Sequence, residues 1–271
     1  MSEDVWLAFL LTLFAGLSTG IGSFIAFFTS TTNTKFLSWA LGFSAGVMIY
    51  VSFMEIIPKA HEALTASTTG ETGSWLTAGG FFAGILMIAI IDRCVPDEKN
   101  PHEVKKVEEM RAPRARVLRD NPELLKMGTL TALAIAIHNF PEGIATFASA
   151  VHDPSLGVAI AIAVAIHNIP EGIAVSVPVY YATGSRWQAF KLSFMSGLAE
   201  PLGAVVAFLF LMPYLNEMSF GFVFASVAGI MVFISLDELL PAARKYDDGH
   251  MTIYGVVLGM AVMATSLILF L

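Results

Sequence analysis

The sequence has one cysteine, Cys94, among its 271 residues. A single thiol cannot form an intramolecular disulfide and cannot supply a cysteine-rich metal site. Charged side chains are also scarce, at 14% of the chain, while 56% of the residues are hydrophobic. A soluble globular protein is less apolar than this, so the composition indicates a polytopic membrane protein.

The scarcity of charge leaves eight apolar runs near the roughly 17–25 residues that a helix needs to cross a bilayer. The opening Met-Ser-Glu-Asp lacks the basic segment of a secretory signal, so we expect the first run to remain as a span. The sequence therefore predicts an all-α polytopic membrane protein with one transmembrane domain, residues 1–271, and a charged loop at 92–126. The predicted spans are Val5–Phe28, Phe36–Pro58, Trp75–Ile91, Met127–Val151, Leu156–Tyr181, Gln188–Met212, Ser219–Leu240 and Met251–Leu271.

Lysine and arginine are unevenly divided between the two sides that eight spans define. The loops after the first, third, fifth and seventh spans, with the start of the sixth span, carry 14 of the 15 basic residues, and the other side carries Lys59 alone. An excess of basic residues marks the cytoplasmic loops of membrane proteins. The pattern predicts that the 92–126 loop is cytoplasmic and that both termini lie outside.

Two near-copies of one phrase interrupt the fourth and fifth apolar runs. Residues 134–145 read Ala-Ile-Ala-Ile-His-Asn-Phe-Pro-Glu-Gly-Ile-Ala, and residues 163–174 read Ala-Val-Ala-Ile-His-Asn-Ile-Pro-Glu-Gly-Ile-Ala. Ten of the twelve positions are identical, and the two copies lie in consecutive predicted spans. Each copy puts an imidazole, an amide and a carboxylate where hydrocarbon is expected, which is costly and therefore indicates a function.

The spacing within each copy puts the three polar side chains on one face of a helix, because the histidine and the asparagine lie four and three residues before the glutamate. The six residues are His138, Asn139, Glu142, His167, Asn168 and Glu171. Pro141 and Pro170 lack an N–H, so we expect each helix to kink, broken at its polar patch, and to free a backbone carbonyl. Imidazole, carboxylate, amide and carbonyl groups are ligands for Zn²⁺, Fe²⁺, Mn²⁺ and Co²⁺.

The predicted topology puts both copies at one depth. His138 lies eleven residues after Met127, and His167 lies eleven residues after Leu156, about 16 Å into each span at 1.5 Å per residue. Glu200, twelve residues into the sixth span and followed by a proline, reaches the same level. Binding sites of secondary transporters typically lie at the membrane midplane on discontinuous helices. The sequence therefore predicts a divalent metal site there.

Other polar residues lie nearer the ends of the spans. Glu55 lies three residues before Pro58, in the outer half of the second span. We interpret Glu55 either as a ligand for entering ions or as a glutamate that reaches interfacial water. Asp237 and Glu238 end the seventh span on the cytoplasmic side, where they act as an anchor at the membrane edge or as ligands for departing ions.

Three alternatives to a transported metal stay open on the residues alone. A buried histidine–glutamate pair can be structural, although three carboxylates and two histidines at one depth are hard to explain by packing. An intramembrane metal-dependent hydrolase needs an open coordination position and a separate general base, and the sequence has no His-Glu-x-x-His. A proton or organic-ion carrier would use the same carboxylates without a metal.

The paired His-Asn-x-Pro-Glu-Gly motifs, the eight-span outline, the long loop after the third span and Gly-Leu-Ala-Glu-Pro-Leu-Gly around Glu200 resemble the ZIP (Zrt/Irt-like) metal transporters, in particular the bacterial ZupT-type branch. The resemblance covers essentially the whole chain. It implies a multi-pass protein of the cell membrane, the inner membrane in bacteria, that is not an enzyme and holds no prosthetic group. It also implies import of Zn²⁺ above all, with Fe²⁺, Mn²⁺, Co²⁺ and Cd²⁺ as further substrates.

The resemblance also implies roles for residues. The six motif residues and Glu200 would line a central site for one or two metal ions, and Glu55 matches a position that contributes a ligand in some members. Its partners would be divalent ions, the lipid bilayer and a second copy in a homodimer, with no nucleic acid. An elevator-like or rocking motion is a further expectation. The 92–126 loop has no histidine-rich run, so metal sensing by that loop is not expected.

Overall fold

The computed structural model describes residues 3–26, 34–94, 122–183, 185–214, 216–245 and 249–270. All regular structure in these ranges is helical, as lipid requires, because a helix pairs its own backbone N–H and C=O groups. The elements are α1 (Glu3–Ala26), α2 (Thr34–Val51), the π-helical turn η1 (Ser52–Ile56), α3 (Ile57–Ala66), α4 (Thr72–Cys94), α5 (Pro122–His152), α6 (Pro154–Thr183), α7 (Arg186–Gly197), α8 (Ala199–Val206), the π-helical turn η2 (Ala207–Leu211), the 3₁₀ turn η3 (Met212–Tyr214), α9 (Glu217–Ile234), the π-helical turn η4 (Ser235–Leu239), α10 (Leu240–Lys245) and α11 (Met251–Phe270).

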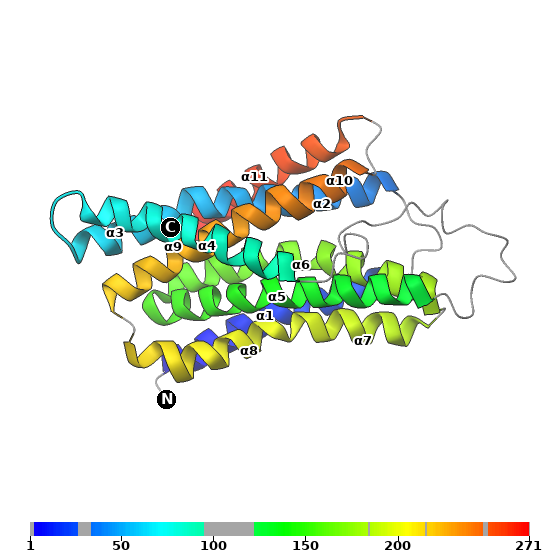
Figure 1. The fold of residues 1–271 in the computed structure, drawn as a ribbon, viewed down its shortest axis with the longest axis horizontal. Helices are drawn as coiled ribbons and strands as arrows, with labels where there is room; N and C mark the ends of the chain where they lie inside the picture. Colours follow the sequence, from blue (N-terminus) through cyan, green and yellow to red (C-terminus); the bar gives the residue numbers. More distant parts are fainter. Residues whose placement is uncertain are drawn as a thin grey trace, which may run out of the picture.

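These elements form eight rods along the long axis of the molecule (Figure 1). The rods are α1, α2–η1–α3, α4, α5, α6, α7–α8–η2–η3, α9–η4–α10 and α11. α1 begins and α11 ends toward the same end of the bundle, which we call the terminal end; α2, α5 and α7 begin toward the opposite end, the loop end (Figure 1). In the described part of the chain these eight rods match the eight apolar spans that the sequence predicts.

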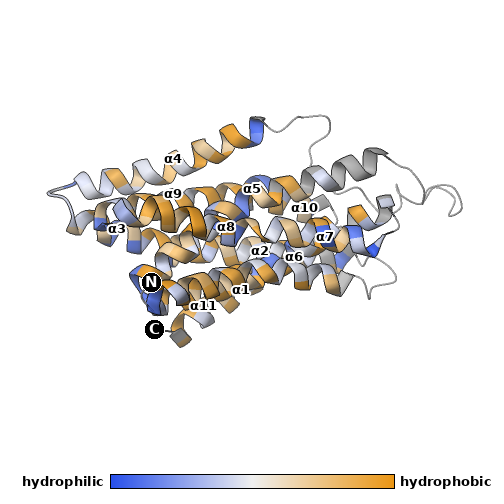
Figure 2. Ribbon diagram, turned by 90° about the horizontal axis from the view of Figure 1, so that it is seen from below, coloured by the Kyte–Doolittle hydropathy of each residue, from blue (hydrophilic) through white to orange (hydrophobic). Residues whose placement is uncertain are grey.

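The surface of the bundle suits a lipid environment. Seven helical segments of the described part are long and apolar enough to cross a membrane, and α5, with 31 residues, is a further long helix. Apolar residues run along the rods, and hydrophilic residues gather toward the two ends (Figure 2). Large apolar side chains such as Phe82, Leu86 and Leu269 are more than 60% exposed. The chain is therefore an all-α, multi-pass membrane protein, as predicted.

Three rods contain a π-helical turn, and each turn comes just before a proline. η1, η2 and η4 end two residues before Pro58, Pro213 and Pro241. A proline offers no N–H to the carbonyl four residues earlier, and that carbonyl lies inside the π-helical turn in all three cases. The second rod therefore continues to Ala66, and the predicted end of this span at Pro58 is wrong.

The prolines of the repeated motif do not break their helices. α5 runs through Pro141, and α6 runs through Pro170. The predicted break at these positions is wrong, because a helix can continue past a proline if it leaves one carbonyl without its usual donor. The break lies instead at Leu198, the turn between α7 and α8. α7 ends there at Gly197, whose carbonyl is the one that Pro201 cannot serve.

The rods pack in two groups. α1, α5, α6, α7 and α8 pack on one another, and α2, α3, α4, α9, α10 and α11 form the second group. Glycines allow the backbones of the first group to approach closely, since a Cβ on Gly22 would overlap the carbonyl oxygen of Ile169, and a Cβ on Gly143 would overlap that of Glu200. The groups meet mainly where α2 contacts α6 and where α5 contacts α9.

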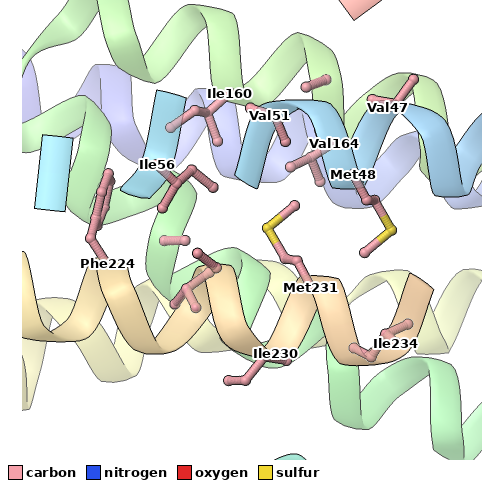
Figure 3. Packing of buried hydrophobic residues seen from close by; sticks show 14 of the residues in the cluster. Val47, Met48, Val51, Ile56, Ile160, Val164, Phe224, Ile230, Met231 and Ile234 are labelled. Carbon is pink, nitrogen blue, oxygen red and sulfur yellow. The ribbon is translucent and has the colours of Figure 1, made fainter. Parts of the chain in front are cut away.

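An apolar layer fills the contact between the groups (Figure 3). Met48 and Val51 of α2 face Met231 of α9, and Val164 of α6 lies beside them (Figure 3). All four side chains are at most 2% exposed. The polar motifs thus lie on helices of the first group, and this apolar layer separates much of that group from the second.

Candidate metal site

The repeated motifs lie about halfway along α5 and α6. His138 is near the middle of the helix Pro122–His152, and His167 is near the middle of the helix Pro154–Thr183. Glu200 lies at the centre of the rod Arg186–Tyr214. The six motif residues and Glu200 are all at most 2% exposed. The fold therefore buries the predicted central residues near the middle of the bundle.

The two motifs face each other crosswise. Nε2 of His138 lies 3.3 Å from Oε1 of Glu171, and Nε2 of His167 lies 3.2 Å from Oε1 of Glu142. Helical spacing had put each histidine on one face with the glutamate of its own copy. Because α5 and α6 are antiparallel, each imidazole meets the carboxylate of the other copy instead.

The nitrogen–oxygen distance within each pair is the distance expected between two ligands of one cation. Two ligands of a tetrahedral zinc ion, at bond lengths of about 2.0–2.2 Å, stand about 3.3–3.5 Å apart. Among the described residues, Nε2 of His138, both carboxylate oxygens of Glu171 and Oε1 of Glu142 also lack a hydrogen bond. Within the described ranges, however, no three His, Cys, Asp or Glu side chains form a complete metal-ligand group. The structure thus contains two pairs of donors that a cation would have to draw together.

The second nitrogen of the His167 imidazole also has a neighbour. Nδ1 of His167 lies 3.2 Å from the backbone carbonyl oxygen of Ala163, which can only accept a hydrogen bond. In neutral imidazole this assigns the proton to Nδ1 and leaves the lone pair of Nε2 facing Glu142, the form in which histidine binds metals. A lone pair that faces a carboxylate is repelled unless a proton or a cation lies between them.

The two asparagines are held through their nitrogens. Nδ2 of Asn168 donates to the carbonyl oxygen of Ala15 at 2.9 Å and to Oε1 of Glu200. Nδ2 of Asn139 donates to the carbonyl oxygen of Ser196 at 3.4 Å. The amide oxygens of both asparagines and Oε2 of Glu200 are buried and have no hydrogen-bond partner in the part of the chain that the structure describes. These three oxygens form a second set of donors, suited to a hard or borderline cation.

Glu238 lies closer to this site than its place in the sequence suggested. It lies in η4, is 7% exposed, and has Oε2 3.8 Å from Nδ1 of His138. Its neighbour Asp237 is exposed. The signal that distinguishes them is Pro241, since the π-helical turn before a proline changes which side chain of an acidic pair points inward.

Glu55 is not part of the central cluster. It is half-buried in η1, and it makes no hydrogen bond or ion pair with the seven central residues in the described part of the chain. One turn further along, Lys59 borders a cavity of about 220 Å³ at the terminal end. Glu62, Asp153 and Glu217 also line this cavity, so its wall carries three carboxylates.

Comparison with known proteins adds a family to this geometry. The family model described as "ZIP Zinc transporter" matches residues 3–123 and 95–267. Proteins named "Zinc transporter ZupT" are similar to the chain along its length. That of Oceanobacillus iheyensis is 69% identical over 98% of this chain and 99% of the relative, and that of Lysinibacillus sphaericus is 66% identical over 99% of each. That of Streptococcus mutans is 58% identical over the whole of both chains. The three names describe transporters and give no support to the hydrolase alternative.

Proposed function

This chain belongs to the ZIP zinc transporter family, and on that premise we propose that it carries divalent metal cations, above all Zn²⁺, into the cytoplasm through the centre of the bundle. The observation that carries the proposal is the pair of crossed histidine–carboxylate contacts buried halfway along α5 and α6. One acidic group at the centre of a membrane costs roughly 2.5–3.5 kcal/mol on the translocon scale. A dication that passes between these groups would offset the cost of burying them.

The donors fall into two sets along the proposed path. The first set combines imidazole and carboxylate, from His138, Glu142, His167 and Glu171. The second set contains only oxygens, from Asn139, Asn168 and Glu200. Carboxylates offset the desolvation of the cation, and amide oxygens replace its water without added charge. Mixed nitrogen and oxygen donors also suit Fe²⁺, Mn²⁺, Co²⁺ and Cd²⁺, so selectivity among these ions would come from geometry and availability.

The orientation of the bundle in the membrane follows from where the basic residues lie. Lys35 lies at the start of α2, Arg93 at the end of α4 and Arg186 at the start of α7, all at the loop end, whereas Lys59 lies in α3 toward the terminal end. We therefore assign the loop end to the cytoplasm and both termini to the outside. The acidic cavity at the terminal end then serves as the entrance for cations, and Glu55 lies between it and the central donors.

Assembly and motion belong to the same proposal. We assign the protein to the bacterial inner membrane as a homodimer, on the strength of its family. Transport would require one group of rods to rock or slide past the other. The apolar layer between α2, α6 and α9 supports such a movement, because hydrocarbon contacts are not directional, and a shift along them breaks few specific bonds.

Zinc flux into liposomes tests the proposal. Purified protein in sealed vesicles should move Zn²⁺ inward, and Glu142→Ala or Glu171→Ala should abolish the flux while the protein remains folded in the membrane. Glu3→Gln, an exposed residue at the start of α1, is the matched control. Unchanged flux in both alanine variants would remove these residues from the path. Protons moving without bound metal would favour the carrier alternative.

A further inference from the structure

Ten buried side-chain nitrogen and oxygen atoms have no hydrogen-bond partner in the part of the chain that the structure describes. Eight of them belong to six of the seven central residues, and the other two are the hydroxyl oxygens of Thr19 and Thr146. A buried polar atom without a partner lowers stability, so such atoms commonly mark the place of an ion or a water molecule. Thr19 and Thr146 therefore share with most of the central residues a buried polar atom that has no hydrogen-bond partner among the described residues.

Other buried hydroxyls in this bundle behave differently. Thr12 donates to the carbonyl oxygen of Ala8 at 2.8 Å, and Ser52 and Ser235 likewise donate to the carbonyl four residues earlier, each at 2.7 Å. This local bond is the usual way for a helix to satisfy a buried serine or threonine. Thr19 and Thr146 are also helical and are 0% exposed, yet neither makes it.

The two threonines lie toward opposite ends of the group of central donors, Thr146 beyond Glu142 and Thr19 beside Gly172, which follows Glu171. Thr146 follows Glu142 by four residues on α5, so it shares the face of Glu142 and lies one turn, about 6 Å, nearer the terminal end. Thr19 follows Ala15, which accepts a hydrogen bond from Asn168, by four residues on α1, so it lies one turn nearer the loop end than Ala15, at the level of Gly172. A Cβ on Gly197 would lie 2.9 Å from the Thr19 hydroxyl, so Thr19 also borders the break between α7 and α8.

We propose that the hydroxyls of Thr146 and Thr19 are the outer and inner steps of the cation path, each taking the place of one water molecule on a partly hydrated divalent cation. This deepens the proposed function and rests on it. A neutral hydroxyl suits such a step, because it compensates for a lost water while adding no charge that would hold the ion in place. The central carboxylates are then reached and left through weaker oxygen donors.

Isosteric substitution tests the proposal. In proteoliposomes, Thr146→Val and Thr19→Val should each slow zinc uptake about fivefold to tenfold, because each loses one oxygen donor without a change of shape. Thr146→Ser and Thr19→Ser should restore uptake to within about twofold. Thr12→Val, whose hydroxyl serves only its own helix, is the matched control and should transport like the natural protein. If a valine variant does not accumulate, comparison of serine with alanine at that position gives the same test.

Thermal unfolding in a metal chelator gives a readout that a packing role would not reproduce. The two valine variants at positions 146 and 19 should be as stable as the natural protein or more stable, because they remove an unpaired buried hydroxyl and lose no hydrogen bond. Thr12→Val should be less stable, because it loses its bond to Ala8. Slower transport with equal or higher stability supports the proposal.

Several results would overturn it. Unchanged uptake in a valine variant removes that threonine from the path, and equal slowing in valine and serine variants assigns the effect to packing. If the natural protein itself moves no zinc, the proposed function fails first. If it moves zinc and both valine variants match Thr12→Val, the proposed function stands and the role of the threonines fails.

Discussion

His138 and Glu171 belong to different copies of one motif, yet their side chains meet, with Nε2 of the histidine 3.3 Å from Oε1 of the glutamate. The reciprocal pair, His167 and Glu142, meets at 3.2 Å. When one polar motif is repeated on two antiparallel neighbouring helices, the histidine of each copy can meet the glutamate of the other, as it does here. Metal affinity should therefore depend on both copies, and removing either partner of a pair should cost about as much as removing both.

Replacing Glu171 with glutamine removes one charge and keeps the shape. We expect Glu171→Gln to weaken zinc binding by purified protein about a hundredfold, because a charged ligand of a dication becomes neutral. His138→Ala added to it should cost less than the sum of the two single changes, since the residues form one pair. Equilibrium dialysis measures both quantities. Affinity equal to that of the natural protein would exclude Glu171 as a ligand.

Asn168 should tolerate alanine better than aspartate in the absence of metal. Asn168→Asp loses the bonds to Ala15 and Glu200 and adds a charge beside the Glu200 carboxyl group, whereas Asn168→Ala loses the bonds alone. We expect the aspartate variant to melt about 4 °C or more below the alanine variant in chelator. Added zinc should reduce the difference in melting temperature between the two variants, since a cation offsets the extra charge of the aspartate. Equal melting temperatures would contradict the proximity of Asn168 and Glu200.

Gly143 should be far more sensitive to a methyl group than Gly79. A Cβ on Gly143 would overlap the carbonyl oxygen of Glu200, whereas a Cβ on Gly79 would have no atom of the described residues within 4 Å. Gly143→Ala should lower stability by about 1–3 kcal/mol or more and reduce zinc uptake by moving α8, and Gly79→Ala should do neither. Unfolding in detergent and uptake in vesicles measure these effects. A stable, active Gly143→Ala protein would exclude the close contact of α5 with α8.

Zinc binding should weaken at acid pH. Protons compete with the cation for the lone pairs of imidazole and carboxylate, so binding releases protons, and lowering the pH drives them back. The dissociation constant should rise roughly tenfold per pH unit for each proton released. Calorimetry between about pH 7.5 and pH 5.5, in buffers of different ionisation enthalpy, counts these protons. Binding that is independent of pH would exclude the histidines as ligands.

Glu238 and Asp237 should differ although they are adjacent. Glu238 is buried near Nδ1 of His138, and Asp237 is exposed. Glu238→Gln should lower zinc affinity about tenfold, because a group that contacts the second nitrogen of a metal-binding histidine fixes the tautomer and orientation of the ring. Asp237→Asn should stay within about twofold of the natural protein. Equal effects would show that the pair acts through net charge at the end of the rod.

Much of the fold could be predicted, because the forces that decide it act along single segments. Eight apolar runs of sufficient length gave the number of predicted spans. The positions of His138 and His167 within two of these runs gave the predicted depth of the motifs in the membrane. The end of the second span at Pro58 was predicted wrongly, since a proline ends a helix only if no other geometry absorbs its missing N–H. Here a π-helical turn absorbs it, and Ala66 ends the rod.

The candidate site was only partly predictable. The rotation of one helix relative to its neighbour decides which side chains meet, and the sequence of a single helix does not determine that rotation. The spacing put the imidazole and carboxylate of each copy on a common face, but it did not indicate which pairs would meet. The sequence set Glu55 apart from the central residues, in the outer half of the second span, and the structure likewise has it in η1 outside the central cluster. The spacing did not single out Thr146, whose hydroxyl has no hydrogen-bond partner in the described part of the chain.

By itself, the sequence determined that this chain is a bundle of membrane-spanning helices with a doubled His-Asn-x-Pro-Glu-Gly motif halfway through. Hydrophobic length and helical periodicity are properties of one segment in lipid, and they suffice for that. Only the tertiary structure decided that His138 meets Glu171 and that Glu238 turns inward. It also decided that the hydroxyls of Thr19 and Thr146 have no hydrogen-bond partner among the described residues. These relationships arise where helices cross, and glycine contacts and proline-induced turns set each crossing through atoms distant in the chain.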